Sequence, residues 1–341
     1  MTSIANNLQI AGKDNFRSIN KGYDSVFKTD QISIGLVVPI ERYDASPVPT
    51  MQNHLARVQL AEELGFKSVW LRDVPFNVPS FGDAGQVFDP FVYLGYLAAK
   101  TKKIALGVSS IVLPLRHPAH VAKAAASTDV LSEGRLILGV ASGDRPEEYP
   151  ALNMTYDDRG ERFRESYDYI RAMAEDYPDL KSQYGSARNN IDMLPKPIHG
   201  EIPMLITGGS QQSPEWIAAN GDGWMLYPRN PLTQAKIISE WRERIAEKGG
   251  VSRPVMEPLY IDLTDDPDTP PQPIHLGLRL GAKYLNDYLA ARQEIGVNHV
   301  ALNLRFNQSN IEKTMDVLAQ EVLSNFHQQK SKQKERITED V

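Results

Sequence analysis

The stretch Ile202-Pro-Met-Leu-Ile-Thr-Gly-Gly-Ser210, followed directly by Gln211-Gln-Ser-Pro-Glu-Trp-Ile-Ala218, decides the predicted fold. An apolar run of strand length stops at two glycines and a serine. A helical pattern then opens with a proline and a glutamate, residue types that the first turn of a helix tolerates well. Free N–H groups at a helix start, approached closely through glycines, form a site for phosphate. An ordinary strand-to-helix turn is the alternative interpretation.

This strand–helix unit recurs about eight times along the chain. Apolar runs predict strands at 34–39, 68–73, 104–113, 135–141, 203–207, 223–227, 255–263 and 299–304. Between them, helical patterns lie at 51–64, 89–100, 119–131, 159–176, 214–220, 231–248, 283–295 and 310–326. Eight alternating units favour a closed parallel (β/α)₈ TIM barrel. A doubly wound open sheet is the alternative, but the Gly-x-Gly-x-x-Gly motif usual after its first strand is absent.

The rest of the chain fits around one barrel domain. We expect a polar, irregular N-terminal arm at 1–30, the barrel at 31–327 and a polar C-terminal tail at 328–341. The segment 177–202 is longer than an ordinary loop, and so is 264–281, an insertion after the seventh strand. Because loops after barrel strands border the catalytic face, we expect the proline-rich 264–281 insertion to act as a lid. A disordered surface excursion is the alternative.

Composition excludes several classes of function. The 341 residues are 41% hydrophobic and 23% charged, with a net charge of −6 and no cysteine. The negative charge and the lack of a basic run argue against nucleic acid, and no apolar stretch is long enough to span a bilayer. Without cysteine, disulfides and thiolate metal sites are excluded. The start lacks the blocks of a signal peptide, so we expect a cytoplasmic protein.

The predicted strand ends carry few residues able to do chemistry alone. They lack paired carboxylates, a histidine pair and a lysine, so we expect neither a metal site nor a Schiff base. A site rich in Gly, Ser and Arg suggests that a bound cofactor supplies the chemistry. The strand-end residues are Arg72, Asp73, Ser109, Ser110, Ser142, Gly143, Arg145, Gly208, Gly209, Ser210, Tyr227, Arg229, Asn303 and Arg305.

Five blocks in this order resemble the bacterial luciferase-like flavin monooxygenases, which share a barrel with the deazaflavin F420-dependent reductases. The resemblance spans residues 32–326, and the sequence Trp-Leu-Arg-Asp-Val-Pro at 70–75 places it nearest an uncharacterised branch. The blocks are Ala61-Glu-Glu-Leu-Gly-Phe-Lys-Ser-Val-Trp70, Leu106-Gly-Val-Ser-Ser-Ile-Val-Leu-Pro-Leu-Arg-His-Pro118, Asp129-Val-Leu-Ser-Glu-Gly-Arg-Leu-Ile-Leu-Gly-Val140, Pro203-Met-Leu-Ile-Thr-Gly-Gly-Ser210 with Pro214-Glu-Trp216, and Asp222-Gly-Trp224.

The resemblance implies specific roles around the cofactor. In the family, a non-proline cis peptide on the third strand bulges against the isoalloxazine ring, and the matching bond here is Ser109-Ser110. Ser142 stands where luciferase has an arginine, so Arg145 is the expected cationic partner. The resemblance implies a cofactor site formed by Ser109, Ser110, Ser142, Gly143, Arg145, Gly208, Gly209, Ser210, Ser213 and Tyr227, with the phosphate on the amides around Gly209, Ser210 and Ser213.

The chain departs from luciferase after the second strand, where luciferase has a histidine base and this sequence has Arg72-Asp73. The light-emitting reaction is therefore not implied. We expect Arg72 to hold an anionic or carbonyl group with Asp73 orienting it; a buried Arg–Asp pair closing the barrel top is the alternative. Arg279, flanked by two leucines in the insertion, is expected to reach into the site. These three residues are the catalytic candidates.

The resemblance implies an FMN-dependent oxidoreductase, in particular a monooxygenase that takes reduced FMN from a separate flavin reductase and uses O₂ on a small organic substrate. Two alternatives stay open: an F420-dependent hydride-transfer reductase, and a non-catalytic flavin-binding relative. A homodimer is the family expectation. The sequence does not identify the organic substrate.

Overall fold

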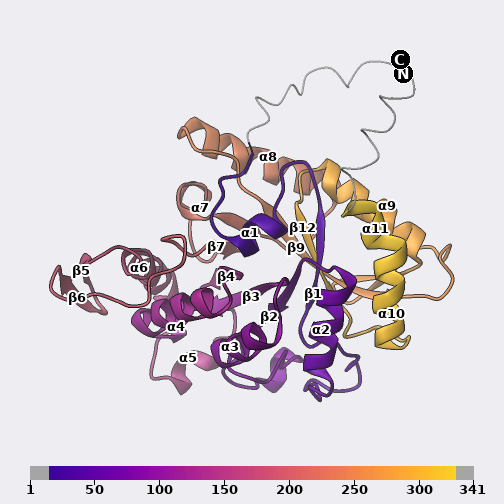
Figure 1. The fold of residues 1–341 in the computed structure, drawn as a ribbon, viewed down its shortest axis with the longest axis horizontal. Helices are drawn as coiled ribbons and strands as arrows, with labels where there is room; N and C mark the ends of the chain where they lie inside the picture. The colour runs from indigo at the N-terminus through magenta and orange to yellow at the C-terminus, as the bar shows by residue number, and fades with distance from the viewer. Residues whose placement is uncertain (1–14, 328–341) are drawn as a thin grey trace.

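The computed structural model describes residues 15–327 and forms one closed barrel of eight parallel strands (Figure 1). Neighbouring strands pair in the order β1-β2-β3-β4-β7-β8-β9-β12, and the ring closes through the parallel pairing of Ser33 with His299. The predicted TIM barrel is therefore confirmed. The barrel strands are β1 (Ser33–Val37), β2 (Ser68–Leu71), β3 (Ala105–Val112), β4 (Leu136–Ala141), β7 (Met204–Thr207), β8 (Gly223–Met225), β9 (Val255–Leu263) and β12 (His299–Asn303).

Helices follow the strands and cover the outside of the barrel, as Figure 1 shows. Four of them start with proline at the first helical position, preceded by a side chain that accepts a bond from a backbone amide, as at Asp89 and Ser213. The outer helices are α2 (His54–Leu64), α3 (Pro90–Lys100), α4 (Pro118–Leu131), α6 (Arg159–Ala172), α7 (Pro214–Asn220), α8 (Pro231–Glu247), α9 (Ala282–Glu294) and α10 (Ile311–Val317), which continues through η3 (Leu318–Leu323) and α11 (Ser324–Phe326). Shorter turns are η1 (Pro79–Phe81), η2 (Leu113–Leu115) and α5 (Glu148–Ala151).

Both long segments contain hairpins. The first holds β5 (Asp179–Ser182) and β6 (Gly185–Arg188), which form a separate two-stranded sheet. The insertion after β9 holds β10 (Gln272–Ile274) and β11 (Gly277–Leu280), and β11 runs parallel to the last four residues of β9. The insertion is thus an extension of the barrel sheet at its carboxyl end rather than a plain loop.

The described part of the expected arm is irregular except for one short helix. Residues 21–26 form α1 (Lys21–Val26), and Tyr23 and Phe27 are buried against side chains from the barrel interior. No local pattern predicts this helix, because the segment is short and polar on its outer side, and its few apolar residues contact their partners only in the closed barrel. The remainder of the arm, 1–14, and the predicted tail, 328–341, lie outside the described residues.

The amino-terminal half of the barrel interior is a packed core. Trp70 fills it, and a Cβ at Gly107 would lie 2.2 Å from the Trp70 ring, so only glycine fits there. The Trp70 indole donates to Nε2 of the fully buried His299, 2.9 Å away, which leaves Nδ1 as the donor to the Ser33 hydroxyl at 2.7 Å. Burial lowers the pKa of His299 to about 3. In TIM-barrel enzymes the active site lies at the carboxyl ends of the strands.

Within residues 15–327, no helix combines the length and the apolar character that crossing a bilayer requires.

Candidate functional site

The turn after β7 presents backbone amides rather than serine side chains. Gly208, Ser210 and Gln211 all have positive φ angles, between 44° and 59°. Ser210 Oγ donates back to the Thr207 carbonyl at 2.7 Å, and Ser213 Oγ caps α7 by accepting from the Trp216 amide at 3.2 Å. The amides of residues 209–211 bond to no acceptor among the described residues. They are the groups left to bind an anion.

Open space borders this turn. A Cβ added at Gly208 or Gly209 would meet no heavy atom within 4 Å. Gly209 and Gln211 are exposed, while Ser210 is buried. The turn therefore has room for a ligand against its backbone amides, and that a phosphate binds there stays a prediction.

Arg164, on α6, stands beside the same turn and was missed by the sequence analysis. Its Nε and Nη2 donate to Oε1 of Gln212 at 3.0 and 2.8 Å. The Gln212 amide group in turn donates to the Gly160 carbonyl, 2.8 Å away. This exposed guanidinium adds positive charge close to the free amides. No sequence signal could pair it with the turn, because 48 residues separate the two partners.

The middle of β3 is partly exposed at two serines. Every residue of β3 is buried except Ser109 and Ser110, which are half-buried. The Ser109-Ser110 peptide bond is cis, which confirms the geometry expected from the resemblance, and the register between β3 and β4 shifts at this point. The Ser110 hydroxyl shares a hydrogen bond with the hydroxyl of Thr207, the last residue of β7. The bulge of β3 and the turn after β7 therefore border the same mouth of the barrel.

The residues after β4 lie between the β3 bulge and the turn after β7, because β4 is the strand between β3 and β7. Ser142 is buried, and its carbonyl accepts a hydrogen bond from the Tyr149 hydroxyl. Gly143 has a φ of 80°, and a Cβ there would lie 2.7 Å from a Val112 methyl and 2.8 Å from the Tyr149 oxygen. Only glycine therefore allows this close packing. Whether Ser142 and Gly143 touch a cofactor stays a prediction.

Arg145 turns toward the loop after β2. Its Nη2 donates to the Asp83 carbonyl at 3.0 Å, and its guanidinium lies 4.1 Å from the centre of the Phe81 ring. Its Nη1 is 3.9 Å from Glu148, whose pKa burial raises to about 7. None of its described contacts is with the turn after β7, where Arg164 stands instead. Its predicted role as the cofactor's cationic partner gains no support from this geometry.

Arg72 and Asp73 follow β2 and diverge, because successive side chains on a strand point to opposite sides. Arg72 Nη1 donates to Oδ2 of Asp83 at 2.6 Å. Asp73 instead accepts from Nε and Nη2 of Arg116, at 3.0 and 2.7 Å, and from the Val112 amide at 3.1 Å. The two residues do not pair with each other. The alternative of an Arg72–Asp73 pair closing the barrel is therefore wrong. That Arg72 holds a substrate group and Asp73 orients it stays a prediction.

Asp83 is the centre of the charge network at this side of the mouth. Its Oδ2 also contacts Nη1 of Arg305 at 3.0 Å, and its Oδ1 accepts from the Gly85 amide at 2.8 Å and from the Tyr43 hydroxyl at 3.2 Å. Burial acts to raise the pKa of Asp83, but Arg72, the Gly85 amide and Arg305 outweigh it and hold that pKa below its ordinary value. Asp83 is therefore a carboxylate at neutral pH. It lies in a loop with no motif, so no sequence pattern pointed to it.

Aromatic side chains line the mouth beyond this network. Tyr260, on β9, is near enough to Arg72 for that charge to act on its pKa, which burial raises. The insertion brings His275 to the same place, with ring centres 6.1 Å from Tyr260 and 5.9 Å from Phe306. Tyr227, after β8, is exposed, and that it lines the mouth stays a prediction. His275 was not predicted as a site residue, because it lies in the turn between β10 and β11 and not at the end of a barrel strand.

Arg279 lies at the rim. Its Nη1 donates to Oδ2 of Asp262 at 2.8 Å, and the side chain is 44% exposed. The other oxygen of Asp262 accepts from the Gln308 amide at 2.8 Å, which ties β11 to the segment after β12. Arg279 thus holds the insertion in place in this structure. That it reaches a bound cofactor stays a prediction.

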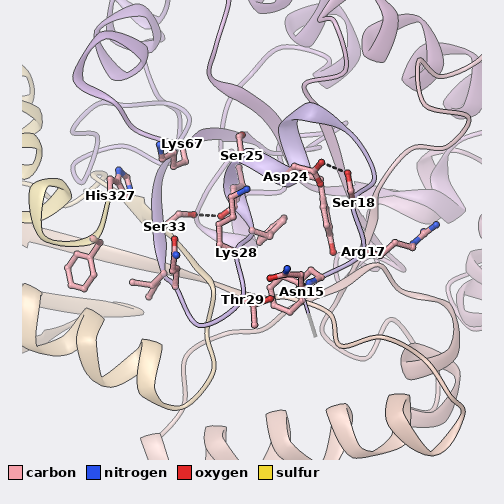
Figure 2. Close-up of a pocket in the computed structure, with 17 residues that line it drawn as sticks. Asn15, Arg17, Ser18, Asp24, Ser25, Lys28, Thr29, Ser33, Lys67 and His327 are labelled. Atoms are coloured by element: carbon pink, nitrogen blue, oxygen red, sulfur yellow. Dashed lines mark hydrogen bonds between the residues drawn. The ribbon is translucent and has the colours of Figure 1, made fainter. Parts of the chain in front are cut away.

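The opposite face of the barrel holds a separate cavity of about 560 Å³. Figure 2 shows its lining, which comes from the segment around α1 together with Ser33, Lys67 and His327. It lies at the amino ends of the strands, behind the core filled by Trp70. It is therefore not part of the site at the carboxyl ends.

A comparison with known families assigns the chain to one of them. The model of the luciferase-like monooxygenase family matches residues 32–262, and the chain belongs to that family. Its members are oxidoreductases, monooxygenases among them.

The individual relatives that carry a functional name are named for different activities. An uncharacterized protein of Mycobacterium tuberculosis is 30% identical over 194 residues, which are 51% of this chain and 67% of that protein. The alkanal monooxygenase alpha chain of Photorhabdus luminescens is 26% identical over 188 residues, 53% of this chain and half of that one. Among solved structures, an F420-dependent secondary alcohol dehydrogenase in complex with an F420-acetone adduct superposes with a TM-score of 0.69 at 19% identity, covering 86% of this chain and 98% of that chain. A likeness at this identity supports the fold alone.

Proposed function

We propose that this protein is an oxidoreductase that binds a phosphate-bearing flavin or deazaflavin across the ends of β3, β4 and β7. The observation that carries the proposal is the turn at 208–211, whose free amides face open space at the same mouth as the half-buried Ser109 and Ser110. A phosphate bound to amides at the carboxyl end of a barrel strand is a recurrent arrangement in TIM-barrel enzymes.

The order of the strands divides the mouth into two halves. β3, β4 and β7 are consecutive neighbours, so a cofactor with its phosphate at 209–211 and its ring near Ser109 and Ser110 would span three adjacent strands. The remaining strands, β8, β9, β12, β1 and β2, bring Tyr227, Tyr260 and Arg72 to the other half. We assign the second half to the organic substrate.

Within this class, FMN-dependent monooxygenation is the leading reaction. Reduced flavin, supplied by a separate reductase, would provide the electrons for O₂ chemistry on the substrate. The chain itself would bind the phosphate through the amides at 209–211 and Arg164, hold the ring beside Ser109 and Ser110, and exclude water with the insertion that carries β10 and β11. The similarity to the alkanal monooxygenase alpha chain supports this reaction.

Hydride transfer with F420 is the second candidate. Its support is the similarity to an F420-dependent glucose-6-phosphate dehydrogenase of Kineococcus radiotolerans. The amides at 209–211 suit the phosphate of either cofactor, so turnover has to separate the two.

The test is a pair of reactions on the same preparation. In the first, reduced FMN is mixed with air-saturated buffer, and its reoxidation is followed with and without the protein. In the second, F420 absorbance is followed anaerobically with a small secondary alcohol such as 2-propanol. A rate changed by the protein in the first reaction supports the monooxygenase, and loss of F420 absorbance in the second supports the reductase. Cofactor binding with no effect in either would contradict the proposed catalysis and favour a non-catalytic flavin-binding protein.

A further inference from the structure

Two arginines share one carboxylate oxygen in the substrate half of the mouth. Arg72 Nη1 and Arg305 Nη1 both contact Oδ2 of Asp83, at 2.6 and 3.0 Å. The Asp83 side chain is 9% exposed, and the two arginine side chains are 19% and 10% exposed. One negative charge therefore faces two positive charges in a largely desolvated place, where an unbalanced charge is costly.

Nearby groups do not remove this excess. Arg145 adds a third guanidinium on the Asp83 carbonyl, and its neighbour Glu148 has a pKa that burial raises to about 7, so it is only partly charged at neutral pH. Asp73, the next residue after Arg72, is committed to Arg116 on the other side of the strand. The cluster around Asp83 thus retains at least one positive charge.

Arg72 is the arginine of the cluster whose guanidinium keeps unpaired N–H donors among the described residues. Apart from the bond from Nη1 to Asp83, its guanidinium makes no hydrogen bond to the described residues, and neither Nε nor Nη2 is sealed from solvent. Arg305 is different: Nη2 donates to the Gly82 carbonyl at 3.0 Å, and Nε is buried. Asp83 fixes Arg72 from one side and leaves Nε and Nη2 to pair with a ligand.

The surroundings of Arg72 suit an apolar or aromatic body next to that charge. Tyr260 and Tyr43 are its electrostatic neighbours, and the Arg305 guanidinium lies 4.7 Å from the Tyr43 ring centre and 5.3 Å from that of Phe306. Tyr260 and Phe306 pack with ring centres 5.4 Å apart. Aromatic faces therefore continue from the charged cluster.

We propose that the substrate of this protein is a small organic monoanion, a carboxylate on an apolar or aromatic body, held by Arg72 in the half of the mouth opposite the cofactor. That this anion is a substrate rests on the proposed function; that it binds does not. One added negative charge balances the two arginines that share Asp83. A neutral carbonyl compound, which could accept the same hydrogen bonds, would leave the excess charge uncompensated.

The test measures binding to the protein without cofactor by isothermal titration calorimetry. Benzoate is the probe, and benzamide is its neutral analogue of the same shape. The wild type is expected to bind benzoate at least tenfold more tightly than benzamide. Arg72→Gln is expected to bind the two equally, and Arg72→Lys to keep a preference for benzoate. Arg42→Gln is the matched control, since Arg42 is an exposed arginine after β1 that pairs with Asp44, and it should behave as the wild type.

A second variant separates charge recognition from a purely structural role. Asp83→Asn removes the shared negative charge, so it is expected to bind benzoate more tightly, by severalfold, while benzamide binding stays unchanged. Loss of packing alone would weaken both probes. The proposal is overturned if benzamide binds the wild type as tightly as benzoate, if neither binds, or if Arg72→Gln keeps the preference while folded by circular dichroism. Because no cofactor is present, these results stand apart from the turnover tests of the proposed function.

Discussion

Replacing Gly209 with aspartate places a negative charge at the centre of the proposed phosphate site. Ser210 is the less informative position, because its side chain is buried and bonds back to Thr207, so a larger residue there would disturb the turn itself. Gly209 is exposed, its φ is not positive, and a Cβ there meets nothing within 4 Å. A side chain fits at Gly209 without strain, and the change therefore tests charge alone.

The expected loss follows from Coulomb's law. Two like charges about 4 Å apart repel by about 1 kcal/mol in water and by about 4 kcal/mol near a protein surface. The turn at Gly209 is open to solvent, so the lower part of this range applies, and a loss of about 1.4 kcal/mol corresponds to a tenfold weaker complex. Gly209→Asp should therefore weaken FMN binding at least tenfold, whereas Gly209→Ala should change it less than threefold.

The assay is quenching of flavin fluorescence on titration with each variant. Riboflavin, which has no phosphate, is the internal control, and its affinity should be similar for wild type and Gly209→Asp. The weakening of FMN should also shrink at high salt, because an exposed charge pair is screened. If Gly209→Asp binds FMN as tightly as the wild type, the phosphate does not lie at this turn and the assignment of the cofactor half is wrong.

Three further predictions concern other parts of the molecule. Arg164→Gln should weaken FMN but not riboflavin, by severalfold, in the same titration; an equal loss for both would mean a structural role. His299 stays neutral in the folded protein down to about pH 3, whereas an unfolded histidine takes up a proton near pH 6.5, so stability should fall as the pH falls from 6.5 towards 3, by up to about 1.4 kcal/mol per pH unit from this residue. Urea unfolding at several pH values should show that the free energy of unfolding falls less steeply with falling pH in His299→Gln than in the wild type. An equally steep fall in both proteins would contradict this. If the insertion acts as a lid, FMN should slow proteolysis within 264–281, and equal cleavage rates with and without FMN would rule that out.

The sequence was sufficient for the barrel because its signals are local. Each strand is a short apolar run, and helix starts carry their own marks, such as Ser213 before Pro214 in α7, which occupies the predicted range 214–220. The hairpin of β10 and β11 escaped prediction because its β11 strand, Gly277–Leu280, is stabilised by pairing with β9 rather than by a pattern of its own. Helix α1 escaped for a similar reason, since its buried side chains depend on the closed barrel.

The site could be predicted only where one segment forms it. The turn at 208–211 and the Ser109-Ser110 bond were found because each lies within a few consecutive residues. The charge cluster was not predicted, because its members lie far apart in the sequence. Asp83 comes from a loop without a motif, and Arg305 follows the last strand, 222 residues later. Arg72 was singled out as a strand-end residue, but the alternative that it pairs with the adjacent Asp73 was wrong, because it pairs with Asp83.

The most direct test of the central claim compares the affinities of FMN, riboflavin and F420 for the wild-type protein in one fluorescence titration. A cofactor site built on the amides at 209–211 requires a phosphate, so FMN or F420 should bind with a dissociation constant at least tenfold below that of riboflavin, a difference of about 1.4 kcal/mol. Equal affinity for FMN and riboflavin, together with no binding of F420, would contradict the account.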